Sequence, residues 1–228
     1  MISYISKEHK IQFSHIPKSG CQSIRHFIIK INNDNPEMNI WFSDFKSKYV
    51  IGGTNTLPGY SHYSFVRNPY ARLVSCYYNK IVGQHWTHFI NYFGKTGIHR
   101  PSFEQFVDFI STNNLKINEH WTRQVDLINN LNTKIFKIEE KEKINDEMLL
   151  KTGHSFIYAK PIDHMNIRKD VGSFVGNTPG EELNKMFSEG MQPLVHNFYN
   201  EKILKIVYKL YKNDFESFNY SEKIDTLK

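Results

Sequence analysis

The chain has 228 residues, of which 39% are hydrophobic, and its 29 lysines and arginines exceed its 23 aspartates and glutamates to give a net charge of +6. This length and hydrophobic content predict one folded domain over residues 1–228 and argue against a disordered chain. The apolar windows fall short of the roughly 18 residues of a membrane span, and two cysteines are too few for a disulfide framework.

The charge and the first residues also bear on location and partners. Residues 1–8 lack the basic-then-apolar order of a signal peptide, so we expect a cytoplasmic protein, from a bacterium or in the cytosol of a virus-infected cell. The positive charge favours an anionic ligand, but the basic residues are scattered and form no arginine-rich block. Nucleic-acid binding is therefore a minor alternative, and we expect neither a nucleic acid nor a membrane as partner.

The first half of the chain predicts three strands, two of which lead into helices. Residues 11–24 predict a short buried strand, a tight turn at Pro17 and Gly20, and the first turn of a helix that continues over residues 23–31. Further strands are predicted at residues 48–51 and 63–66, and a helix follows at Pro69, which suits the first helical position.

The second half continues the alternation of strands and helices. Residues 83–101 are aromatic and rich in histidine, and we interpret them as a surface excursion. Ser102 and Gln105 predict a capping box at the start of a helix. The elements predicted after it are a strand at 134–138, a charged helix ending at Gly153, a short helix over 178–190 capped at its start by residues 178–181, and a long helix from 193.

This alternation predicts an α/β fold, a P-loop-like three-layer sandwich with a central, mostly parallel sheet flanked by helices. In such sheets, ligands bind at the carboxyl ends of the strands. Lys18 and Arg67 each follow a predicted strand, so we expect both at the same edge.

The turn after the first strand has the features of an anion site. The free N–H groups of a helix start point at one spot, where the helix dipole favours negative charge, and Lys18 adds a mobile positive charge. The Gly-x-x-x-x-Gly-Lys-Ser/Thr motif of nucleotide triphosphatases is absent, because Lys18 precedes Gly20. The turn therefore predicts a phosphate-like ligand held in another way.

A second candidate anion site follows the strand at 63–66. Arg67 lies at the strand end and Ser75 two helical turns further on, and a guanidinium and a hydroxyl so placed can bind one phosphate. The alternative is structural: Arg67 would bond helix-end carbonyls and Ser75 would be an ordinary helix residue.

Together these stretches resemble the sulfotransferases that use 3′-phosphoadenosine 5′-phosphosulfate, in the branch of the carbohydrate enzymes (sulfotransferase family 2). Residues 16–23 (Ile-Pro-Lys-Ser-Gly-Cys-Gln-Ser) resemble the family's 5′-phosphosulfate loop, and residues 65–80 resemble its 3′-phosphate motif. Weaker similarities follow in order at residues 118–124 (His-Trp-x-x-Gln), 135–139, 164–166 and 211–220, so the resemblance covers nearly the whole chain.

The resemblance implies sulfuryl transfer from this donor, a co-substrate, to a hydroxyl of a carbohydrate or other small acceptor, without a metal. Lys18 would stabilise charge on the bridging oxygen as the sulfur–oxygen bond breaks, and Arg67 and Ser75 would bind the 3′-phosphate. Arg168 would close over the phosphosulfate, or belong to a solvated loop. The 5′ end would be held by Lys18 and the N–H groups of Ser19, Gly20, Cys21, Gln22 and Ser23.

The general base is the open question. Gly53 stands where the family often has histidine. His120 is the first candidate, because it matches a polar family segment and is predicted to open a helix, and His15, just before the loop, is the second. Both have packing or capping roles as alternatives. His62 begins a strand and is expected far from the active edge.

Other assignments remain as alternatives. His85 and His88 lack a further ligand for a metal site, and both cysteines, Cys21 included, are expected to fill space rather than act as nucleophiles. The competing function is a nucleotide-binding P-loop protein, kinase-like or catalytically degenerate, that performs no sulfuryl transfer.

Overall fold

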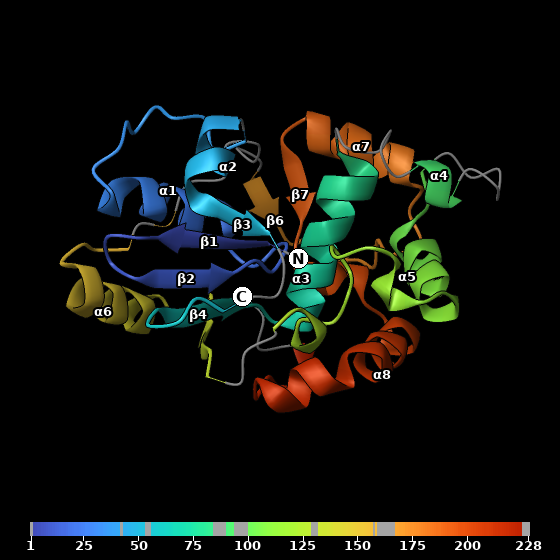
Figure 1. Cartoon of the computed structure of the whole chain (residues 1–228). Coiled ribbons are helices and arrows are strands. Elements are labelled where there is room, and N and C mark those ends of the chain that lie inside the picture. The colour runs from blue at the N-terminus through green and yellow to red at the C-terminus, as the bar shows by residue number, and fades with distance from the viewer. Residues whose placement is uncertain are drawn as a thin grey trace. The chain divides into compact units, whose positions relative to one another are not determined.

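The computed structural model describes residues 2–41, 43–52, 56–83, 90–93, 100–128, 132–156, 158 and 167–224. The chain divides into two compact units, each built from two stretches (Figure 1). The first unit comprises Met1–Arg67 and Gln124–Ile162, and the second comprises Asn68–Arg123 and Asp163–Lys228. The expectation of a single domain over residues 1–228 stays a prediction.

The first unit contains a five-stranded sheet with the order β3-β1-β2-β4-β5. β2 pairs with β4 and β4 with β5 in parallel, whereas β1 is antiparallel to both β2 and β3. Four of the five strands therefore run in one direction, which confirms the prediction of a mostly parallel sheet. The strands are β1 (Ile2–Ser6), β2 (Ile11–Ser14), β3 (Val50–Gly52), β4 (Ser61–Val66) and β5 (Lys134–Lys137).

One face of this sheet carries the core of the first unit. The register places Tyr4, Phe13 and Tyr63 in one row across three strands, and Phe65 beside Phe136. Buried side chains of three helices join this cluster: α1 (Cys21–Ile31), α2 (Ser43–Tyr49) and α6 (Lys141–Thr152). The first unit thus has the α/β composition that was predicted. The expectation that helices cover both faces of its sheet stays a prediction.

Two details of this unit differ from the sequence prediction. β1 was not predicted, and the strand expected at 48–51 begins at Val50, because Lys48 and Tyr49 belong to α2. The end of α6 was predicted correctly: its C-cap is Gly153, whose φ of 74° lies in the left-handed region that favours glycine.

The second unit is mainly helical. Asn68 caps α3 (Pro69–Tyr77) by accepting from the N–H groups of Tyr70 and Ala71, and a π-helix continues it over Tyr78–Val82. The predicted capping box at Ser102 and Gln105 is confirmed. The other elements are α4 (Ile90–Phe93), α5 (Phe103–Thr112), a 3₁₀ turn at Leu115–Ile117, β6 (Ile167–Lys169), α7 (Gly180–Ser188), β7 (Met191–Pro193), a 3₁₀ turn at Val195–Phe198 and α8 (Glu201–Ser217).

Two predictions for this unit were wrong. The long helix expected from residue 193 is α8, which begins only at Glu201, because the side chain of Asn200 caps it there. Phe93, expected in a surface excursion, is buried in the aromatic core around α3, α5 and α8. The start of α7, in contrast, lies where it was predicted, because its N-cap Pro179 belongs to the stretch 178–181.

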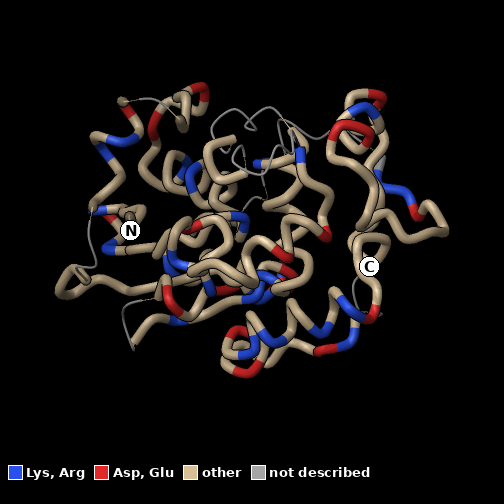
Figure 2. The backbone as a smooth tube through the Cα atoms, turned by 90° about the vertical axis from the view of Figure 1, so that its right-hand side faces the viewer, with Lys and Arg blue, Asp and Glu red and all other residues tan. Residues whose placement is uncertain are grey.

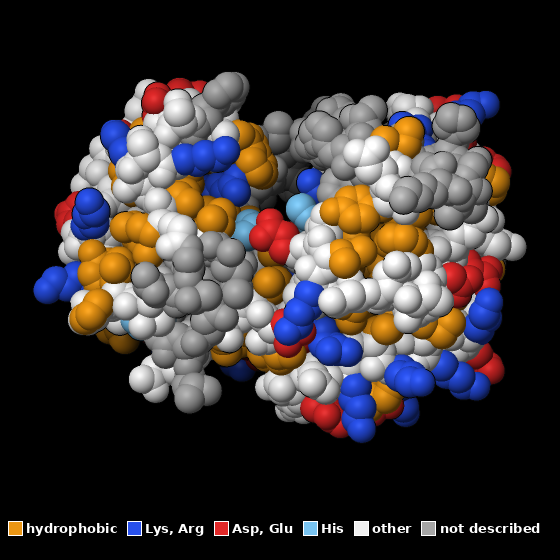
Figure 3. Space-filling model, turned by 45° about the vertical axis from the view of Figure 1, so that its right-hand side comes forward, with side chains coloured by type: hydrophobic (Ala, Val, Ile, Leu, Met, Phe, Trp, Pro, Cys, Tyr) orange, Lys and Arg blue, Asp and Glu red, His pale blue; other side chains and the backbone are white. Residues whose placement is uncertain are grey.

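The surface has mixed character. Basic and acidic positions are interspersed along the chain (Figure 2). On the face that Figure 3 shows, hydrophobic side chains lie among charged and polar ones. Of the helices that the structure describes, none has the length and apolar character needed to span a bilayer.

Candidate anion-binding site

The chain between β2 and α1 forms a tight loop that ends in a helix N-terminus. Lys18 and Gly20 have φ values of 69° and 83°, and the N–H of Ser19 donates to the Ile16 carbonyl at 3.2 Å. A Cβ at Gly20 would lie 3.0 Å from Cδ1 of Ile138, so both conformation and space favour glycine there.

The N-cap of α1 is Gly20, which has no side chain to cap this eleven-residue helix, and the first turn contains no acidic residue. The first intrahelical bond runs from the N–H of Ile24 to the carbonyl of Gly20 at 3.1 Å. The amides before it, of residues 20–23, precede the regular helical bonds, and the helix dipole favours an anion beside them. The loop therefore has the geometry that an anion site requires.

Arg67 follows β4 directly and lies beside this loop. β2 and β4 are parallel neighbours, and their arrows point the same way in Figure 1, so both loops leave the same sheet edge. Nη1 of Arg67 donates to the carbonyl of Lys18 at 3.3 Å. The prediction that Lys18 and Arg67 share one edge is confirmed, and a carbonyl contact of the kind expected for a structural arginine is present as well.

Gln124 joins the two loops, a role that sequence reasoning missed. Its side chain is fully buried. Oε1 accepts from the hydroxyl of Ser19 at 3.1 Å and from the N–H of Arg67 at 2.9 Å, and Nε2 donates to the Arg67 carbonyl at 2.9 Å. The similarity of residues 118–124 to His-Trp-x-x-Gln marked this glutamine, but nothing local indicated its partners.

Ser19 therefore has both of its donors engaged within the unit. Its N–H bonds the Ile16 carbonyl and its hydroxyl bonds Gln124. These bonds shape the loop, and binding of the donor by Ser19 stays a prediction, as it does for Gly20, Cys21, Gln22 and Ser23.

His15 is held in one tautomer by its neighbours. The hydroxyl oxygen of Tyr4 accepts from Nε and Nη2 of Arg25 at 3.0 and 2.8 Å, and it lies 2.6 Å from Nδ1 of His15. An oxygen that accepts twice gives its own proton to the third partner, so Nδ1 of His15 is an acceptor. The neutral ring then carries its proton on Nε2.

His120 is held in the opposite tautomer. Oδ1 of Asn118 accepts from the backbone N–H of His120 at 2.9 Å, and the same oxygen lies 2.7 Å from Nδ1 of the ring. Nδ1 therefore carries the proton, and Nε2 of the neutral ring has a lone pair that can accept one. His120 does not open a helix as predicted, because residues 119–121 form a turn, Thr122 lies in a bend, and the next 3₁₀ helix is Val125–Leu127.

The segment of His120 is anchored on both sides by one buried arginine. Nη1 of Arg72 donates to the Thr122 carbonyl at 2.8 Å, and Nη2 donates to the Glu119 carbonyl at 3.2 Å. Arg72 belongs to the stretch that resembles the 3′-phosphate motif, but in this structure it positions the backbone around His120.

The other predicted ligands also lie in the second unit. Ser75 is half-buried on α3. Arg168 is exposed and belongs to strand β6, where it pairs with Gln192, so the expectation of a loop there was wrong. The binding roles of Ser75 and Arg168 stay predictions.

Several assignments fall outside the described residues, namely Gly53, His85, His88 and residues 164–166. Among the residues that the structure does describe, no group of three or more His, Cys, Asp or Glu could hold a metal ion.

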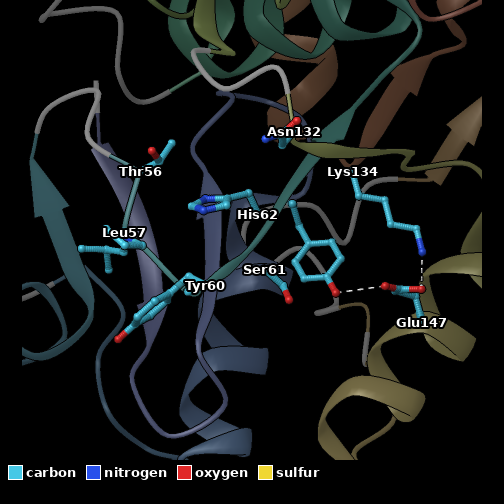
Figure 4. A pocket seen from close by; sticks show the side chains of 11 residues that line it. Thr56, Leu57, Tyr60, Ser61, His62, Asn132, Lys134 and Glu147 are labelled. Carbon is cyan, nitrogen blue, oxygen red and sulfur yellow. Dashed lines mark hydrogen bonds and ion pairs between the residues drawn. The ribbon is translucent and has the colours of Figure 1, made fainter.

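His62 lies at the start of β4, as predicted, and lines an open groove of about 550 Å³ there. In Figure 4 its ring points into this groove, where Glu147 bonds Lys134 and the Tyr63 hydroxyl. The groove lies at the edge where β4 and β5 begin, whereas Lys18 and Arg67 lie where β2 and β4 end.

Comparison with known proteins agrees with the resemblance of the motifs. The sequence model of the sulfotransferase family matches residues 3–221, which is most of the chain. Neither a curated protein nor a solved structure matches it.

The bridging role of Gln124 leads to a stability prediction. Gln124→Ala leaves the Ser19 hydroxyl and the Arg67 N–H without their acceptor, so we expect the free energy of unfolding to fall by about 3 kcal/mol. Hydrogen exchange at the Arg67 amide should accelerate. Urea unfolding and amide exchange measure the two effects.

Gln12→Ala is the matched control, because Gln12 is also buried and bonds Ser3 and Leu57 in the same unit. It should lose stability without a selective change at Arg67. In Gln124→Glu, only a protonated carboxyl can donate to the Arg67 carbonyl, so its pKa rises and stability should recover at acid pH and fall as pH rises. Unchanged exchange at Arg67 in Gln124→Ala would contradict the bridge.

Proposed function

The chain belongs to the sulfotransferase family, and we propose that it moves a sulfuryl group from 3′-phosphoadenosine 5′-phosphosulfate to a hydroxyl of a carbohydrate or other small acceptor. The observation that supports this donor most is the coupling of two anion motifs at one sheet edge, where Arg67 bonds the Lys18 carbonyl and Gln124 bonds both loops. A donor with phosphate groups at both ends requires two such sites.

At the 5′ end, the proposed ligands are Lys18 and the amides at the start of α1. The phosphosulfate is an anion, and a helix start with glycine as its N-cap and no acidic residue in its first turn stabilises it. As the sulfur–oxygen bond breaks, negative charge grows on the bridging oxygen. The Lys18 ammonium would then stabilise the transition state more than the ground state, which is the requirement for catalysis.

At the 3′ end, the proposed ligands are Arg67 and Ser75. A guanidinium presents paired donors that match phosphate oxygens, which a lysine does not. Gln124 fixes the Arg67 backbone through both its N–H and its carbonyl. The adenosine half of the donor and its reacting half would thus be held by loops that are bonded to each other.

For the proton of the acceptor hydroxyl, the tautomers favour His120 over His15. Nε2 of His120 is the basic nitrogen, because Asn118 holds the proton on Nδ1. In His15 the basic nitrogen is Nδ1, and it already bonds the Tyr4 hydroxyl. We propose His120 as the general base and Asn118 as the residue that positions it.

Nucleotide selectivity tests the 3′-phosphate assignment. We expect adenosine 3′,5′-bisphosphate to raise the melting temperature, and adenosine 5′-monophosphate to raise it far less, because only the former has the group that Arg67 would bind. Arg67→Ala should abolish the difference. Equal shifts from the two nucleotides in the wild-type protein would refute the assignment.

Lys18→Ala tests the charge on the leaving oxygen. We expect transfer from radiolabelled donor to fall by about 10²–10³ or more, the usual loss for one electrostatic group at a developing charge. The melting temperature without nucleotide should change little, because the positive φ at Lys18 remains unfavourable for alanine to a similar degree. Full turnover in this variant would remove Lys18 from the mechanism.

His120→Ala tests the base. Turnover should fall by about 10²–10⁴ while the affinity for the bisphosphate is retained. Asn118→Leu should also lower turnover, since Nδ1 would no longer be fixed as the donor, and Asn118→Asp should move the rising limb of the pH–rate profile to higher pH. Undiminished turnover in His120→Ala would exclude it, and binding without turnover in the wild type would favour the catalytically degenerate alternative.

A further inference from the structure

Four side chains of the first unit form a hydrogen-bonded row that ends in the anion loop. Arg25 donates twice to the Tyr4 hydroxyl, that hydroxyl bonds Nδ1 of His15, and His15 bonds the side chain of Cys21. Because Nδ1 of His15 accepts from Tyr4, the nitrogen that donates to sulfur is Nε2. A thiolate at Cys21 would therefore accept a hydrogen bond from an imidazole that is held in the donating tautomer.

The position of Cys21 favours the same charge. It is the first residue of α1. The neutral thiol donates to the Ile16 carbonyl at 3.0 Å, and this bond opposes ionisation because a thiolate has no proton to donate. Helix starts and neighbouring cations favour thiolates. Burial raises the pKa of the Cys21 thiol, but the electrostatic interactions with His15, Arg25 and Lys18 and the hydrogen bond from His15 outweigh it, so the pKa falls below its ordinary value.

Arg25 gives an independent indication that an anion belongs here. It is only 8% exposed, and its Nη1 has no hydrogen-bond partner among the described residues. The guanidinium carbon lies 4.2 Å from the ring centre of Trp41 and 5.1 Å from that of Tyr4. A buried cation flanked by rings is costly unless an anion lies near it, and Cys21, one helical turn earlier on α1, can supply that charge.

We propose that Cys21 is a thiolate-forming cysteine and a modification site for hydroperoxides and soft alkylating agents. This proposal differs from the expectation that Cys21 only fills space. With a hydroperoxide, the thiolate attacks the distal oxygen: a sulfur–oxygen bond forms, the oxygen–oxygen bond breaks, and the alkoxide or hydroxide leaves and is protonated by water. Sulfur is oxidised to the sulfenic acid and the peroxide is reduced.

A second consequence rests on the proposed function. If the phosphosulfate binds at the start of α1, it brings negative charge to the same place as the thiolate. Donor occupancy and the thiolate then exclude each other, and oxidation of Cys21 lowers donor binding. The loop is thereby sensitive to peroxide when it is empty and protected when it is occupied.

The test is the rate of alkylation by iodoacetamide at each cysteine, followed by mass spectrometry between about pH 5 and 9. We expect Cys21 to react with a pH midpoint below the value of about 8.5 for free cysteine, and Cys76, which is fully buried, to stay unlabelled. At neutral pH, His15→Gln should slow the reaction by about tenfold, which corresponds to one unit in the midpoint.

Two further variants serve as a second test and as a control. Tyr4→Phe removes only the hydroxyl that sets the His15 tautomer and should also raise the midpoint, even if His15→Gln fails to fold. His26→Gln, on the same helix but without influence on Cys21, should leave it unchanged. A midpoint at or above that of free cysteine, or one that is insensitive to both His15 and Tyr4, would overturn the proposal.

The last experiment measures labelling of Cys21 in the presence of adenosine 3′,5′-bisphosphate. Protection of Cys21 in proportion to nucleotide occupancy supports the exclusion. If Cys21 is labelled rapidly and saturating bisphosphate leaves the rate unchanged, the mutual exclusion of donor and thiolate would be overturned. This result would also count against donor binding at the start of α1, but it would leave the reactivity of Cys21 supported. If Cys21 is not labelled and the bisphosphate still raises the melting temperature, the proposal of a reactive thiolate would be overturned, and the proposed donor site would be unaffected.

Discussion

The candidate site depends on one buried amide. Gln124 accepts from Ser19 and Arg67 and donates to Arg67, so the loop after β2 cannot move relative to the loop after β4 without breaking buried hydrogen bonds. Parallel pairing of the two strands places both loops at the same edge. The amide then fixes their separation, which is what a ligand with two anionic ends requires.

Neighbouring groups hold His15 and His120 in opposite tautomers. Tyr4 and Asn118 each contact Nδ1, but Tyr4 donates to it and Asn118 accepts from it. The result is an imidazole that donates at Nε2 beside Cys21 and another that accepts at Nε2 in His120. One tautomer suits the stabilisation of a thiolate and the other suits the removal of a proton.

Local patterns in the sequence were sufficient to predict many of the strands, helices and helix caps. β2, β4 and β5, the helix after Gly20 and the capping box at Ser102 depend on near neighbours and were predicted. The bond between Ser19 and Gln124 joins residues 105 apart, so no local pattern could indicate it. Residues 193–200 have helical apolar spacing, but the Asn200 cap delays the helix to Glu201. The tautomers of His15 and His120 likewise depend on three-dimensional neighbours.

The most direct test of the account is a crystal structure of the protein with adenosine 3′,5′-bisphosphate. We predict the 5′-phosphate at the amides of the α1 start with Lys18 beside it, and the 3′-phosphate on the Arg67 guanidinium. Binding of the nucleotide in the groove where β4 and β5 begin, around His62 and Lys134, or contact of Arg67 with neither phosphate, would contradict it.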